Sequence, residues 1–332
     1  MSTSGTSASS QGTQVHRLFA RRLLQAIPLL LIVSVLVFAL IHAAPGGPLT
    51  LYLSNPNVRP ADIERLRRAL GLDQPLWRQY VAWLGAFVRG DWGYSYADGR
   101  PVLDRLLERV PATLELIGSS MLLGALAALP LGIVAAVRRR GWFDRVTTVL
   151  SFAGISLPVF WFGLLLQLVF AVRLGWLPSS GRSSAGGGGF TDRLEHLLLP
   201  AAVLALVHAA AWSRYLRASM SQVLRQPFMI AARARGVPGR TLLLRHALRN
   251  ALIPVLTVVL LDAAIMVSGA VVTESVFAWP GVGSLFTEAL AKRDYTVLMA
   301  FLMLSSCAVV ALGLAGDLIY GWLDPRIGGG SS

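Results

Sequence analysis

The 332-residue sequence contains a single cysteine, Cys307, and a single lysine, Lys292. One cysteine excludes a disulfide within the chain and argues against a thiolate metal site. A standard phosphate-binding loop for ATP needs Gly-Lys-Ser/Thr, whereas the lysine here stands between alanine and arginine, so the chain has no such loop. The five histidines are scattered without metal-ligand spacing, and no Gly-x-Ser-x-Gly or His-Glu-x-x-His occurs. These absences indicate that the chain by itself is not an enzyme.

Charge is also scarce, since only 14% of the residues are charged whereas 55% are hydrophobic. This balance is typical of a protein that spans a membrane. The formal net charge of +13 would suggest nucleic-acid binding in a soluble protein. In a membrane protein, an excess of arginine in the cytoplasmic segments explains it, so we expect a lipid bilayer as the environment and no nucleic-acid partner.

Long apolar runs predict an all-α integral membrane protein with six transmembrane helices. The predicted spans are residues 23–41, 113–137, 146–172, 196–215, 251–272 and 295–320. Pro158 lies near the middle of the third span and predicts a kink there. A cleaved signal peptide is the alternative interpretation of the first run, although that run is longer than a usual signal core.

The spans divide the chain into four regions. These are a disordered cytoplasmic N-terminus (1–16), an N-terminal region (17–112), a core transmembrane domain (113–324) and a flexible C-terminal tail (325–332). Residues 44–110 contain no membrane-length run and predict three amphipathic helices that form a small helical cap, with Pro111 opening the second span. The Gly/Ser-rich residues 174–195 predict a flexible external loop.

Arginine is distributed unevenly between the two sides of this predicted topology. Segments on one side carry a strong excess of arginine, namely Arg17, Arg21, Arg22, Arg138, Arg139, Arg140, Arg145, Arg214, Arg217, Arg225, Arg233, Arg235, Arg240, Arg245, Arg249 and Arg326. Segments on the other side mix both signs of charge. The positive-inside rule therefore predicts that both termini are cytoplasmic and that the helical cap is extracytoplasmic.

Residues 222–249 form a polar, arginine-rich segment between two apolar runs. Gln226-Pro227 ends the preceding helix, residues 228–235 predict a short helix, and Gly236 suits the position just after it. Small alanine side chains allow close approach of a partner, and the arginines lie near the C-terminal end, where the helix dipole favours cations. From these residues alone, a surface for a cytoplasmic partner and a helix lying on anionic lipid are equal alternatives.

Several motifs carry a resemblance to a known family. Ile230-Ala231-Ala232 followed by Gly236 is similar to the "EAA" motif, a Glu-Ala-Ala with Gly four residues later, although the Glu is absent here. Similar stretches are RHALRNALIP (245–254), GLDQPLWRQY (71–80), GDWGYS (90–95), ESVFAWPGVG (274–283) and LDPR (323–326). From about Leu18 to Arg326 the chain resembles the permease subunit of ATP-binding-cassette (ABC) importers of the oligopeptide/dipeptide (peptide/nickel) group, a binding-protein-dependent transport inner membrane component.

The resemblance implies a type I ABC importer permease fold in the bacterial cytoplasmic (inner) membrane. It implies as partners a second homologous permease, two cytoplasmic ATPases that hold the ATP and Mg²⁺, and an extracytoplasmic solute-binding protein. This chain itself would bind no cofactor. The implied cargo is a short peptide, with nickel chelates, glutathione or another small solute as alternatives. A stand-alone secondary transporter or channel and a membrane-anchored enzyme are the alternative classes.

Three sets of site residues follow. The resemblance assigns coupling to the ATPase to Phe228, Met229, Ile230, Ala231, Ala232, Arg233, Arg235 and Gly236. A charge inside a span is costly, so Asp262 must face protein or water, and the stripe Asp262, Met266, Gly269 and Thr273 with His208 is the candidate translocation path. An interhelical hydrogen bond is the alternative for Asp262, and a packed histidine for His208. Glu274, Phe277, Trp279 and Pro280 are the candidate extracytoplasmic gate or binding-protein contact, and the cap either packs alone or also touches that protein.

Overall fold

The computed structural model describes residues 6–43, 59–69, 71–139 and 141–323, and these are mainly helical. The elements are α1 (Thr6–Ala43), α3 (Pro60–Ala69), α4 (Leu76–Val88), α5 (Val102–Val137), α6 (Trp142–Ser156), α7 (Val159–Leu166), the π-helical η1 (Gln167–Arg173), α8 (Phe190–Val223), α9 (Pro227–Ala234), α10 (Gly239–Thr241), the π-helical η2 (Leu242–Ala247), α11 (Leu248–Val276), α12 (Val282–Ala291) and α13 (Tyr295–Leu323). The predicted all-α fold is confirmed for these residues. The predicted tail and part of the cap, residues 44–58, lie outside the described ranges.

Five helical segments are long and apolar enough to cross a membrane within the described residues. They are Leu24–Ala43, Val102–Val137, Phe190–Val223, Gly239–Met266 and Tyr295–Gly316. These segments overlap the first, second, fourth, fifth and sixth predicted spans. The third predicted span differs, because residues 146–172 are divided between α6, α7 and η1.

The division of the third span has a local cause. Pro158 lacks a backbone N–H and disfavours a helical conformation in the residue before it. The helix α6 therefore ends at Ser156, and α7 begins at Val159 with Pro158 as its N-cap residue. The sequence predicted a kink in one continuous span, whereas the structure has a break between two shorter helices.

Four other elements differ from the predicted organisation. The third cap helix and the second span are one helix, α5, because side chains on both sides of Pro111 are buried and hold it in line. Residues 6–16 are helical rather than disordered, since extending an existing helix costs far less than starting one. Helix α8 begins at Phe190 and runs to Val223, and α12 lies in a segment where no helix was predicted.

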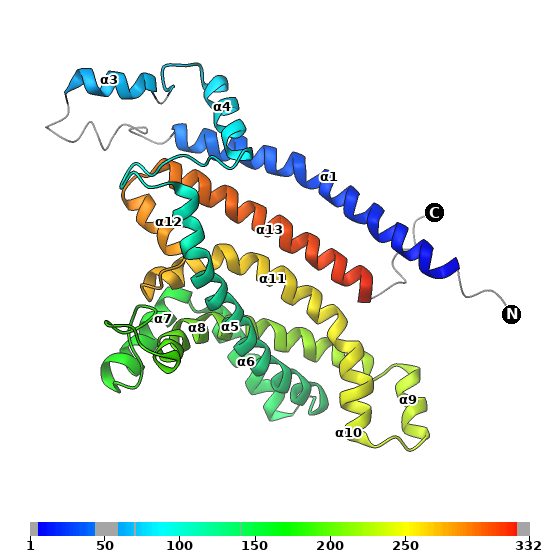
Figure 1. Ribbon diagram of the computed structural model, residues 1–332. Coiled ribbons are helices and arrows are strands. Elements are labelled where there is room, and N and C mark those ends of the chain that lie inside the picture. The colour runs from blue at the N-terminus through cyan, green and yellow to red at the C-terminus, as the bar shows by residue number, and fades with distance from the viewer. Residues whose placement is uncertain (1–5, 44–58, 70, 140, 324–332) are drawn as a thin grey trace.

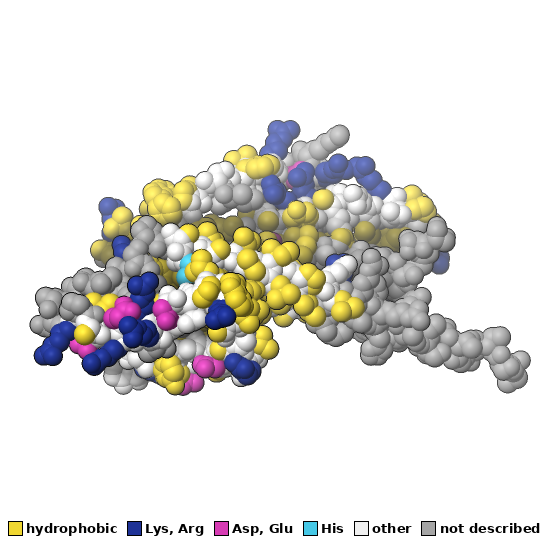
Figure 2. Space-filling model, turned by 90° about the horizontal axis from the view of Figure 1, so that it is seen from above, with side chains coloured by type: hydrophobic (Ala, Val, Ile, Leu, Met, Phe, Trp, Pro, Cys, Tyr) yellow, Lys and Arg dark blue, Asp and Glu magenta, His cyan; other side chains and the backbone are white. Residues whose placement is uncertain are grey.

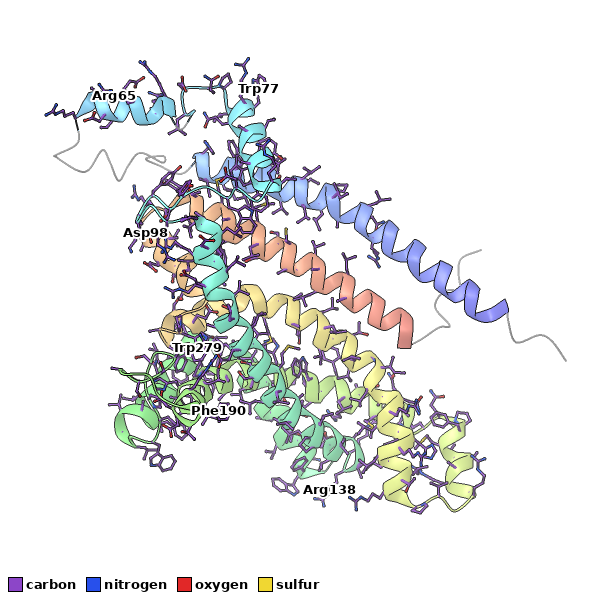
Figure 3. The ribbon with its side chains drawn as sticks, viewed as in Figure 1. Arg65, Trp77, Asp98, Arg138, Phe190 and Trp279 are labelled. Carbon is purple, nitrogen blue, oxygen red and sulfur yellow. The ribbon has the colours of Figure 1, made fainter. Side chains whose placement is uncertain are left out.

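The long helices run between two ends of the molecule (Figure 1). The start of α1, the end of α13 and the pair α9 and α10 lie toward one end, whereas α3, α4 and α12 lie toward the other. Helices α5, α8 and α11 share a buried core that includes Leu116, Leu204 and Met266. Helices α1 and α13 join the ends of α5 and α12 in a second core. Figure 3 accordingly places Arg138 toward the same end of the molecule as α9 and away from Asp98.

The cap helix α4 packs on α1 through aromatic side chains. Tyr80 contacts the ring of Phe38 edge to face, with 5.5 Å between the ring centroids, and its hydroxyl lies 2.8 Å from Ser34 Oγ. Figure 2 shows hydrophobic side chains over the middle of the molecule, with acidic and basic side chains gathered together at the end that holds α3 and α12. This mixture of signs agrees with the charge pattern that the sequence predicts for one side of the membrane.

Candidate functional site

Helix α9 lies where the sequence predicts a short helix, and both of its ends follow from local residues. Pro227 occupies the first turn, where its missing N–H costs no hydrogen bond. Gly236 has φ of +78°, the left-handed conformation that glycine adopts most easily. Val237 N donates to Ala232 O at 3.3 Å and Gly236 N donates to Arg233 O at 2.9 Å. This pair of bonds is a Schellman motif, which ends the helix and turns the chain back toward the membrane domain.

The two faces of α9 differ in their surroundings. Met229 and Ala232 are buried against residues of α8 and η2, including Met220 and Leu242. By contrast, the Ile230 side chain is 61% exposed and the Phe228 side chain 44% exposed. Ala231, Arg233, Arg235 and Gly236 are exposed as well. Of the residues predicted to meet a partner, Met229 and Ala232 therefore hold α9 to its own chain, and the others remain accessible.

A continuous path of packed residues joins α9 to the far end of α11. Ser219 Oγ of α8 donates to the carbonyl oxygen of Ala251 at 2.9 Å and so ties α8 to α11 beside the buried cluster that holds α9. The short α10 and η2 lead directly into α11, which continues to Val276. A displacement of α9 would therefore move α8 and α11 with it, because these elements share one buried cluster.

Asp262 lies inside α11 and contacts two side chains of α8. Trp212 Nε1 donates to Asp262 Oδ2 at 2.6 Å, and His208 Nδ1 lies 3.5 Å from the same oxygen. The structure thus shows the interhelical hydrogen bond that was the alternative interpretation of Asp262. Both Asp262 and His208 keep a small exposed part, so a role in a translocation path stays a prediction for them.

The rest of the predicted path residues are placed differently. Met266 lies in the core shared by α5, α8 and α11, and Thr273 is also buried. Gly269 belongs to α11, but its surroundings lie outside the described residues. Among the stripe residues whose surroundings the structure describes, namely Asp262, Met266 and Thr273, only Asp262 keeps exposed surface in this chain.

The C-terminal end of α11 is locked onto α5 by buried hydrogen bonds. Thr113 Oγ1 donates to Glu274 Oε1 at 2.6 Å, and the backbone N–H of Ser284 donates to Glu274 Oε2 at 2.9 Å. Trp279 Nε1 donates to the carbonyl oxygen of Ala112 at 2.8 Å. A Cβ at Gly281 would overlap the Glu274 carboxyl, so only glycine fits there. Burial raises the pKa of the Glu274 carboxyl above its usual value.

These contacts show where the predicted gate residues lie. Glu274, Phe277 and Trp279 are buried within this chain, and Pro280 is half-buried. Phe277 packs near Gly163 of α7, and its carbonyl oxygen accepts a hydrogen bond from Gly181 N at 2.8 Å. As placed, the three buried side chains offer no surface to a binding protein; they fix the turn between α11 and α12 instead. Figure 3 labels Trp279 within this turn.

Ion pairs between distant segments were missed by the sequence reasoning, among them those of Glu115 and Asp144. Glu115 of α5 accepts hydrogen bonds from Arg182, at 2.7 Å, and from Arg193. Asp144 of α6 is buried, and Arg217 Nε lies 2.7 Å from its Oδ1. The partners stand 67, 78 and 73 residues apart in sequence, so no local spacing could have paired them. The sequence signal was only the presence of acids in segments rich in arginine.

Comparison with protein families gives two matches. The model described as "Binding-protein-dependent transport system inner membrane component" matches residues 128–329. The model described as "Binding-prot-dependent transport system membrane comp, N-term" matches residues 15–117. Together the two models match most of the chain, with residues 118–127 between them.

Curated relatives match over most of the chain. The "Oligopeptide transport system permease protein AppB" of Bacillus subtilis (strain 168) is 41% identical over 309 residues, which cover 92% of this chain and 98% of that protein. The "Glutathione transport system permease protein GsiC" of Escherichia coli (strain K12) is 40% identical over 307 residues, covering 92% of this chain and 97% of that protein.

Among solved structures, the inward-facing MetNI methionine ABC transporter matches with a TM-score of 0.57. The identity is 19%, and the match covers 68% of this chain and 99% of that chain, so the likeness concerns the fold. The helical architecture is that of type I ABC importer permeases. The chain therefore belongs to the family of binding-protein-dependent transport system inner membrane components, as a multi-pass permease subunit of an ABC importer of the peptide/nickel type.

Proposed function

We propose that this chain, paired with a second homologous permease, forms the translocation path for short peptides. Two cytoplasmic ATPases drive it, and α9 is the contact through which this chain is coupled to them. The observation that carries the proposal is the division of α9 into two faces. One face is buried in the chain's own α8 and η2, and the other exposes Phe228 and Ile230 beside two arginines. A helix held in this way transmits force from a bound partner to the membrane helices.

The proposed mechanism is alternating access. ATP binding closes the ATPase pair and moves α9, and the shared packing carries α8 and α11 along. The far end of α11 is fastened to α5 through Glu274 and Trp279, so the motion reaches the opposite side of the membrane. ATP hydrolysis then resets the path. Asp262, which keeps exposed surface near His208, is the candidate polar contact for cargo on the way.

The remaining partners follow from the family and from the sequence. Family members belong to binding-protein-dependent transport systems, which supports an extracytoplasmic binding protein as the source of cargo. The chain has no Gly-Lys-Ser/Thr loop, which supports placing ATP and Mg²⁺ on the ATPase subunits and assigning no catalysis to this chain. The arginine-rich end that carries α9 is cytoplasmic in this proposal, and both chain termini lie on that side.

The names of the relatives support a peptide as cargo. AppB is an oligopeptide permease protein and GsiC a glutathione permease protein, and glutathione is itself a small peptide. Their identities to this chain, 41% and 40%, do not separate the two cargos. Short peptides are the primary proposal, and glutathione is the second because of the GsiC match.

A reconstituted importer tests the proposal. The chain is purified with its second permease and ATPases, placed in vesicles, and supplied with the binding protein, ATP and radiolabelled peptides of two to five residues. We expect uptake that needs ATP and the binding protein and that unlabelled peptide competes away. Competition by glutathione but not by other peptides would select the second cargo. Uptake by this chain alone, without nucleotide, would reject the coupling and favour a stand-alone transporter.

A further inference from the structure

A cavity of about 360 Å³ lies beside α8 and is lined by residues other than those that pack with α9. Its lining is dominated by guanidinium groups from Arg139, Arg214, Arg217 and Arg225, with the polar side chains of Ser221 and Gln222 among them. The volume falls in the range of sites that hold small ligands. Nothing in the proposed transport cycle uses this cavity, which we call the arginine cavity.

The charge of the arginine cavity is poorly balanced by the protein. Arg217 is paired with Asp144, which holds it in place against α6. Arg139, Arg214 and Arg225 form no ion pair with any residue that the structure describes. Three cations gathered in one concave site without a carboxylate partner repel one another, so a bound anion would stabilise the arrangement.

The rim of the arginine cavity indicates which kind of anion fits. The guanidinium carbon of Arg214 lies 5.0 Å from the centre of the Phe152 ring on α6. Phe152 belongs to an exposed apolar row on α6 that also contains Val146 and Val149. Trp142 at the start of this helix is 73% exposed, as is typical of aromatic residues at a membrane interface. The cavity thus opens where arginine-rich segments meet an exposed apolar surface of α6.

We infer that the arginine cavity binds the headgroup phosphate of an anionic phospholipid, whose acyl chains lie along the exposed row of α6. Guanidinium groups bind phosphate oxygens through paired charge-assisted hydrogen bonds. Basic pockets between transmembrane helices on the cytoplasmic side suit lipid headgroups, and here they adjoin apolar surface for the tails. The inference rests on the proposed cytoplasmic orientation of this end, but it needs no assumption about the cargo.

Lipid binding to the purified full-length chain tests the inference. The chain in a neutral detergent is titrated with phosphatidylglycerol, phosphatidylcholine and inorganic phosphate, and bound lipid is counted by native mass spectrometry. The test variant combines Arg139→Gln and Arg225→Gln, which leaves the Arg217–Asp144 pair intact. Arg145→Gln is the matched control, because Arg145 is exposed near the start of α6 but does not line the cavity.

Each outcome separates the possibilities. Each cation near the membrane surface strengthens binding about fivefold, so the double variant should bind phosphatidylglycerol about 25-fold more weakly, whereas the Arg145→Gln control should change less than the double variant. Equal binding by the double variant and wild type would overturn the inference. Two further results would also overturn it. If inorganic phosphate bound as tightly as phosphatidylglycerol, the cavity would be a site for a free anion. If the lipid were lost once the ATPases and second permease are bound, the cavity would be a subunit contact.

These outcomes are independent of the transport proposal. Lipid binding is measured on the permease chain without cargo, binding protein or nucleotide. A chain that binds the lipid but fails to import peptide would reject the proposed cargo or coupling and leave the lipid site standing. If the chain binds no lipid, and imports peptide equally well when the cavity arginines are replaced, the lipid site is rejected and the transport proposal stands.

Discussion

Because α9 has one exposed and one buried face, substitutions at the neighbouring residues Ile230 and Met229 should have opposite effects on ATPase binding and on permease stability. Ile230 is 61% exposed and Met229 is fully buried, although they are adjacent in sequence. If α9 is the contact for an ATPase, Ile230→Ala should weaken that contact while leaving the permease stable. Met229→Ala should instead destabilise the permease itself, because it removes side-chain atoms from the packing between α9, α8 and η2.

The expected magnitudes follow from burial. Burying a whole isoleucine side chain stabilises a complex by about 1.5–3 kcal/mol, and the exposed part of Ile230 contributes about 1–1.5 kcal/mol of that, or about a five- to twelvefold change in dissociation constant. A surface substitution changes folding stability by about 0.5 kcal/mol or less. Met229→Ala, by contrast, removes a buried side chain and should lower the stability of the permease by about 2–5 kcal/mol.

The assay measures both quantities on the same samples. Permease variants in lipid nanodiscs are titrated with labelled ATPase subunit to obtain the dissociation constant, and their thermal unfolding midpoints are recorded without ATPase. Val88→Ala serves as the control, because Val88 is 77% exposed on the cap helix α4 at the opposite end of the molecule. An Ile230→Ala variant that binds the ATPase as tightly as the control, or that unfolds as early as Met229→Ala, would refute the reasoning.

Three further predictions concern the end of α9, the C-terminal end of α11 and the contact of Asp262 within α11. Gly236→Val forces a β-branched residue into φ of +78°, at about 1–3 kcal/mol of strain. This variant should still insert into the membrane but should not take up peptide. Gly239→Ala, at a position without a positive φ, is the control and should transport normally. Burial raises the pKa of the Glu274 carboxyl, so its contribution to stability is present at acid pH and is lost as pH rises through that raised pKa. In the Glu274→Gln variant, the thermal unfolding midpoint should therefore depend less on pH than in the wild type. An equal pH dependence of the two midpoints would contradict this. Trp212→Phe removes the donor to Asp262 and should lower stability by about 1–3 kcal/mol in a melting experiment; the loss should be smaller in an Asp262→Leu background, which has no acceptor for the indole N–H.

Local signals in the sequence predicted the ends of α9 but not its orientation. Pro227 and Gly236 act through their own backbone conformations, so these two residues are enough to place the helix along the chain. Which face is buried depends on the packing of α8 and η2 against it. The resemblance assigned Met229 to a contact with a partner, whereas in the structure its side chain packs within its own chain.

The membrane helices show the same division between local and tertiary causes. Apolar length predicted five spans well, since hydrocarbon thickness fixes the length of an apolar helix. Proline was harder to interpret, because Pro158 breaks a helix whereas Pro111 lies inside one whose flanking turns are both buried. The hydrogen bonds of Glu274 and Asp262 join residues 161 and 50 positions apart, so the sequence could mark these carboxyls as unusual without naming their partners.

The central claim is that motion of α9, driven by an ATPase, powers transport through helices that have no energy source of their own. The most direct measurement is peptide uptake in vesicles that contain the complete importer with either wild-type chain or the Ile230→Ala variant, with and without ATP. The account predicts ATP-dependent uptake with the wild-type chain, reduced uptake with the variant at low ATPase concentration, and recovery as ATPase is added. Uptake that is equal for both chains, or that proceeds without ATP and ATPase, would contradict it.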